Sequence, residues 1–103
     1  MKIIKGISEM IEKELCGAEH FAKCAVKHKE DNPALAKVFY EISTQKMEHM
    51  KRLHGEVVKI IEAYRKEKGA PSEAMMAVYE YVHEKQIHKA NEVKMLQEQY
   101  RES

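Results

Sequence analysis

The amino-acid sequence predicts an all-α fold, in which one domain contains three long helices. Apolar residues recur at spacings of three and four along most of the chain, and no segment alternates in the manner of a strand. Strong interruptions occur at 29–35 and 67–74, where proline stands beside residues that cap or end helices. These interruptions divide the 103 residues into predicted helices at about 7–29, 33–68 and 72–102.

Capping residues at the two interruptions support these boundaries. Asn32 is expected to cap the second helix, with Pro33 at the first helical position, where its missing N–H leaves no hydrogen bond unmade. Gly69 can end that helix in a left-handed conformation, and Ser72 can cap the third. The chain should therefore form a long antiparallel helical hairpin followed by a third long helix.

Composition excludes several classes of function. Eighteen Lys and Arg residues against 17 Asp and Glu give a net charge of +1, which offers no field to attract nucleic acid or anionic membrane. No run approaches the roughly 20 apolar residues of a membrane span. Cys16 and Cys24 lie eight residues apart on one predicted helix, about 12 Å, which is too far for a disulfide. We therefore expect a cytoplasmic protein.

Helical geometry predicts which residues face inward, because each residue advances about 100° around its helix. The first helix has its apolar arc at Ile4, Ile7, Ile11, Ala18, Ala22 and Ala25, with Glu14 and Phe21 at the edge. The second has its arc at Leu35, Ile42, Leu53 and Ile60. The third has its arc at Met75, Tyr79, Val82, Gln86, Ala90, Val93 and Tyr100.

Charged residues and histidines fall on or near these apolar arcs, and such groups need partners when buried. On the second helix the arithmetic places Lys46, His49 and Glu56 inside the arc, with Glu48 and His54 pointing away. On the third helix, His83 lies at the margin and Glu80 just beyond it. Glu14, His49, Glu56, Glu80 and His83 are therefore the candidate metal ligands, suited to iron, manganese or zinc.

The first two helices resemble the opening pair of the ferritin-like superfamily, particularly its rubrerythrin-like and small two-helix members. The first helix has Glu14, Phe21 and Ala25 at the spacing of the superfamily's iron-binding Glu, aromatic residue and Ala. The superfamily's second-helix pattern Phe-x-x-Ile-Ala-x-x-Glu-x-x-His is matched by Phe39, Ile42, Ser43, Lys46 and His49. The resemblance covers roughly residues 8 to 65.

This resemblance implies a metal site, from which the chain departs at one position. Lys46 stands where the superfamily has the Glu that bridges two metal ions, and an ammonium group repels a dication. We expect Lys46 to pair with Glu14 instead. Glu80 and His83 form a Glu-x-x-His pair, which the superfamily carries on a fourth helix. This pair could join Glu14 and His49 within one chain or across a dimer, or it could be an ordinary surface pair.

Assembly would decide whether these groups form a site. The second helix, about 54 Å long, outreaches the first, so part of it should stay exposed unless the third helix folds back or a second chain covers it. The residues concerned are Val57, Ile60, Ile61 and Tyr64. A homodimer could complete a four-helix bundle.

Two hypotheses of function follow. One is a ferritin-like metalloprotein, with iron oxidation or peroxide reduction as the chemistry that the resemblance implies. The other is a metal-free scaffold that acts as an oligomeric interaction module. The presence of Lys46 argues against catalysis, and both hypotheses stay open at this point.

Overall fold

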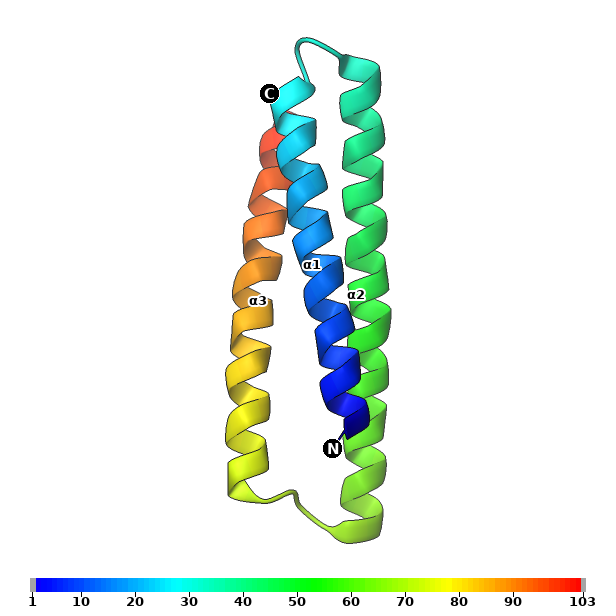
Figure 1. Ribbon diagram of the computed structural model, residues 1–103, viewed down its shortest axis with the longest axis vertical. Helices are drawn as coiled ribbons and strands as arrows, with labels where there is room; N and C mark the ends of the chain where they lie inside the picture. Colours follow the sequence, from blue (N-terminus) through cyan, green and yellow to red (C-terminus); the bar gives the residue numbers. More distant parts are fainter. Residues whose placement is uncertain (1, 103) are drawn as a thin grey trace.

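The computed structural model describes residues 2–102 and confirms an all-α protein with three helices over that range (Figure 1). Helix α1 spans Lys2–His28, α2 spans Pro33–Lys68 and α3 spans Glu73–Glu102. The molecule is elongated, with principal extents of 55 × 19 × 18 Å. None of the three helices, within residues 2–102, contains a stretch long and apolar enough to cross a membrane.

The predicted helix boundaries are confirmed between α1 and α2 and between α2 and α3. The side chain of Asn32 accepts a hydrogen bond from the Leu35 N–H at 3.2 Å, and Pro33 occupies the first turn of α2. Gly69 has a φ of 79°, which a side chain would disfavour, and its N–H donates to the carbonyl oxygen of Arg65. The Ser72 hydroxyl accepts from the Met75 N–H at 3.2 Å, so it caps α3.

The start of α1 was predicted too late, because the helix begins at Lys2 and not near residue 7. Gly6 lies inside the helix, where glycine costs about 1 kcal/mol relative to alanine without ending the helix. Ile4 and Ile7 pack against the core and offset this cost. The longer α1 therefore reaches further along α2 than the sequence suggested.

Helix α1 lies between the other two helices (Figure 1). It packs along both α2 and α3, whereas the backbones of α2 and α3 approach each other closely at few positions. Helix α3 folds back over the hairpin, which was one of the two arrangements expected. Val57, which we expected to stay exposed unless another helix covered it, is 2% exposed, and Ile60, Ile61 and Tyr64 are half-buried.

The buried cluster at the centre of the bundle draws residues from all three helices. Its members are Ile11, Leu15, Ala18, Met47, Val57 and Val93. The inward arc predicted for α1 agrees with this core except that it omitted Leu15, and the arc predicted for α3 agrees except at Met75, which is 37% exposed. The arc predicted for α2 is rotated by about one residue position. Leu35 is 40% exposed, and His49 and Glu56 are exposed as well.

Small residues cause this difference on α2. Its buried residues include Ala36 and Ser43, both fully buried, which let α2 approach its neighbours closely. The larger Ile42 and Ile60 are half-buried at the edge of the interface. The large side chains of this helix therefore lie along the border of its packed face, and small residues occupy the centre.

Candidate functional site

Three of the polar residues that the sequence singled out meet between α1 and α2. The Lys46 Nζ lies 3.6 Å from the Glu14 Oε2, and the His49 Nδ1 lies 3.6 Å from the Glu14 Oε1. The predicted pairing of Lys46 with Glu14 is thus confirmed. Glu14 and Lys46 are largely buried, with 24% and 30% of their side chains exposed, whereas His49 is 55% exposed. The carboxylate of Glu14 therefore has the Lys46 ammonium beside one oxygen and the His49 ring beside the other.

Gly17 makes room for the Lys46 side chain on the surface of α1. A Cβ at this position would lie 2.7 Å from Cδ and 2.9 Å from Cε of Lys46, closer than atoms can approach without displacement. The Nζ of Lys46 also lies 6.0 Å from the ring centroid of Phe21, at the outer limit of a cation–π contact. The lysine is therefore held against α1 by both charge and shape.

The other predicted ligands do not join this cluster. Glu56 is exposed and pairs with Lys59 one helical turn away, at 3.6 Å. Glu80 is exposed on α3, and His83 faces α2 at a different place. Within residues 2–102, no three His, Cys, Asp or Glu side chains are grouped in a way that could hold a metal ion. Cys16 and Cys24 are free thiols, as expected.

His83 is part of a stack of rings that the sequence did not predict. Its ring lies 5.1 Å from that of His54 and 5.7 Å from that of Tyr79, both nearly parallel to it. The prediction that His54 points away from the bundle is wrong, because this side chain is half-buried and its Nε2 is fully enclosed without a hydrogen-bond partner. Burial lowers the pKa of His54 below 6.5, and the charge of His83 lowers it further.

The free energy of unfolding is expected to decrease as the pH falls through and below 6.5. The unfolded chain takes up a proton on His54 at a higher pH than the folded chain does, so acid favours unfolding. Urea unfolding at a series of pH values between about 7 and 5 would measure this. In His54→Phe the pH dependence should become shallower, because a ring remains but no longer titrates.

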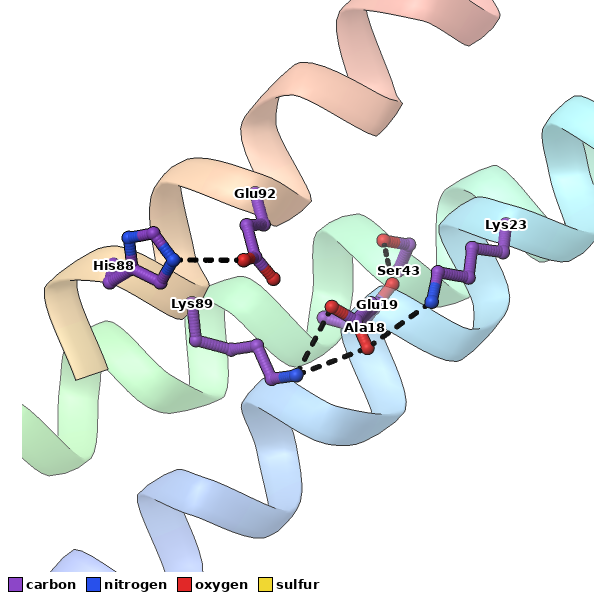
Figure 2. A network of polar contacts seen from close by, with 7 residues as sticks. All are labelled: Ala18, Glu19, Lys23, Ser43, His88, Lys89 and Glu92. Carbon is purple, nitrogen blue, oxygen red and sulfur yellow. Dashed lines mark hydrogen bonds and ion pairs between the residues drawn. The ribbon is translucent and has the colours of Figure 1, made fainter. Parts of the chain in front are cut away.

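His88→Gln is the matched control for that experiment, since the His88 side chain is 79% exposed and pairs with Glu92 on the surface (Figure 2). Its pH dependence should stay close to that of the wild type. If the free energy of unfolding has the same slope against pH in the wild type and in His54→Phe, the assignment of the pH dependence to His54 is wrong.

A second interhelical ion pair joins α1 to α3. The Lys89 Nζ lies 3.1 Å from both carboxylate oxygens of Glu19, and Lys23 approaches the same carboxylate at 3.6 Å (Figure 2). Burial acts to raise the pKa of Glu19, but the hydrogen bond from Lys89 and the nearby positive charges outweigh it and lower that pKa. The same hydrogen bond raises the pKa of Lys89. This pair fixes the register of α3 on α1.

The donor set around Glu14 does not fit a divalent metal site of the ferritin-like kind. Glu14 and His49 would supply two ligands, and the third position is an ammonium group that already lies beside the carboxylate. Glu56, Glu80 and His83 contribute nothing there. What the geometry provides is a charged contact that ties α1 to α2.

Comparisons with protein-family models, with curated proteins and with solved structures find no match for this chain. Within residues 2–102, the chain forms a three-helix protein in which interhelical ion pairs join Glu14 to Lys46 and Glu19 to Lys89.

Proposed function

We propose that this chain is a ferritin-like helical scaffold without a metal site, and that it acts as a homo-oligomeric interaction module. The observation that carries the proposal is the position of Lys46. Its ammonium lies 3.6 Å from Glu14, where the ferritin-like pattern has a bridging carboxylate, and Gly17 leaves room for its stem. The antiparallel pairing of α1 with α2 supports the ferritin-like part of the proposal.

The surface of α3 supports a role in assembly. Its three buried residues are Val93 and two glutamines, and Tyr79 and Ala90 pack against the core while partly exposed. Five of its large apolar residues are instead exposed, namely Met75, Val78, Tyr81, Ile87 and Met95. Apolar side chains gathered on one helix favour contact with another protein surface.

Binding of iron, manganese or zinc is the alternative function, and one observation favours it. Glu14 Oε2 is enclosed and has no hydrogen-bond partner, because the Lys46 ion pair is longer than a hydrogen bond. A movement of Lys46 toward solvent would leave Glu14 and His49 facing the same space. Oxidation of iron or reduction of peroxide would then be the chemistry to test.

Metal content separates the two functions. We expect wild-type protein, grown with iron, manganese and zinc and purified without a metal resin, to contain far less than one ion per chain. Lys46→Glu should bind on the order of one divalent ion per chain, because it places a second carboxylate beside Glu14 and His49. Elemental analysis measures the ions, and light scattering of the same samples gives the mass of the assembly.

Lys51→Glu provides the control, since Lys51 is exposed on the same helix and the change in charge is identical. It should not increase metal content. Stoichiometric metal in the wild type that disappears in His49→Ala would overturn the proposal and establish the metalloprotein. A wild type that is monomeric at all concentrations would overturn its oligomeric part.

A further inference from the structure

A groove opens between the first half of α1 and the first half of α3. Its volume is about 720 Å³, and its α3 wall is apolar, with Met75, Val78 and Val82 among the residues that line it. Val78 is 65% exposed and Met75 is 37% exposed. Unlike the rest of the interface between these helices, this apolar surface has no helix packed into it.

Four charged residues of α1 line the same groove. They are Lys2, Lys5, Glu9 and Glu12, all exposed, at spacings of three, four and three. Residues at these spacings share one face of a helix. The stripe thus carries two positive charges toward the start of α1 and two negative charges one to two turns further along.

Two copies of α1 in antiparallel orientation have complementary charges along this face. If α1 is laid antiparallel against a copy of itself around a two-fold axis level with Ile7, Lys2 faces Glu12 and Lys5 faces Glu9. Each pair occurs twice, because the axis repeats every contact. A parallel arrangement in the same register would instead place like charges together, which is unfavourable.

We propose that this groove binds a second copy of the chain, so that two molecules form a two-fold dimer with antiparallel α1 helices. The ion pairs set the register, and the apolar α3 walls lie beneath them and supply the burial. The inference rests on the proposed oligomeric function and assigns it a surface. The charges of α1 define the partner, since a copy of this chain presents the matching sequence of charges in the reverse order.

Charge reversal tests the dimer. The acidic variant carries Lys2→Glu with Lys5→Glu, and the basic variant carries Glu9→Lys with Glu12→Lys. Each alone should dimerise at least about tenfold more weakly than the wild type, because four like charges then face four like charges. An equimolar mixture should regain the dimer as a heterodimer. Sedimentation equilibrium measures the affinities, and native mass spectrometry identifies the mixed species.

The control variant is Glu41→Lys with Glu48→Lys, which changes the net charge as the basic variant does but on exposed positions of α2. It should dimerise like the wild type. If both variants still dimerise, or if their mixture forms no heterodimer, the assignment of the dimer to this groove is wrong, while the proposed oligomeric function still holds. A monomeric wild type would overturn both, and the metal measurement on Lys46→Glu would still stand by itself.

Discussion

Leu15→Ala is expected to lower the free energy of unfolding by about 3 kcal/mol. Leu15 is 1% exposed and belongs to the central cluster with Ile11 and Val93. Its neighbours along the buried face of α1 are Ala18 and Ala22, which have no side-chain length with which to fill a cavity. The loss in free energy of unfolding should therefore include most of the penalty for the cavity, as well as the free energy lost with the buried apolar side chain. Urea unfolding followed by circular dichroism measures it.

Leu35→Ala is the same substitution at another position. The apolar arc predicted for α2 placed Leu35 in the core. Because Leu35 is 40% exposed, we expect a loss below about 1 kcal/mol. Similar losses for the two variants would show that the sequence-derived arc of α2 was right and that the packing described here is wrong.

The amino-acid sequence predicted the number and type of the helices, and their ends at the two loops, because the signals are local. Asn32, Gly69 and Ser72 act through hydrogen bonds or backbone angles within a few residues, so they can be recognised without knowledge of the fold. Most of the inward face of α1 could also be predicted, because its isoleucines and alanines recur at helical spacing, although the predicted arc omitted the buried Leu15. The early start of α1 could not, because it depends on the packing of Ile4 and Ile7.

The inward face of α2 was harder to predict because small residues occupy its centre. Its large aliphatic residues flank the contact with α1, and a repeat of seven residues marks the true centre. That repeat consists of Ala36, Ser43, Met50 and Val57. A search for a seven-residue line that includes small residues would have found it.

The candidate site was predicted in part. The pairing of Lys46 with Glu14 followed from the resemblance to the ferritin-like pattern, in which the residues at these two positions lie together between the first two helices. The contacts of α3 could not be matched in this way, because a loop between helices does not fix how the next helix rotates. The stack of His54 on His83 and the ion pair of Glu19 with Lys89 both depend on that rotation.

The least predictable contact is a buried polar node that joins all three helices. The Ser43 hydroxyl donates to the carbonyl oxygen of Ala18 at 2.7 Å and accepts from the Gln97 Nε2 at 3.0 Å. Ser43 is fully buried and Gln97 is 8% exposed, so water cannot readily replace either bond. Figure 2 shows the Ser43 side chain directed at the backbone of α1.

Ser43→Ala is expected to lower the free energy of unfolding by about 2 kcal/mol, because it leaves the Gln97 amide enclosed without its acceptor. Gln97→Leu should cost less, about 1 kcal/mol, since Ser43 keeps its bond to Ala18. The double variant should be more stable than the sum of the two losses predicts, by about 1 kcal/mol, because no buried amide then lacks a partner. Urea unfolding of all four proteins completes this double-mutant cycle.

Thr44→Ala and Gln99→Leu form the matched control cycle, one turn or less from the node. Thr44 bonds only within its own helix, to the carbonyl oxygen of Glu41, and Gln99 is exposed. Their effects should add to within about 0.5 kcal/mol. Additive losses in the Ser43 and Gln97 cycle as well would mean that the two side chains act independently, and α3 would then be held to the hairpin by its apolar contacts and by its other polar contacts, such as those of Lys89 with Glu19 and of Arg101 with Tyr40. A coupling confined to Ser43 and Gln97 would instead make this node the contact that sets the rotation of α3, which the sequence left open.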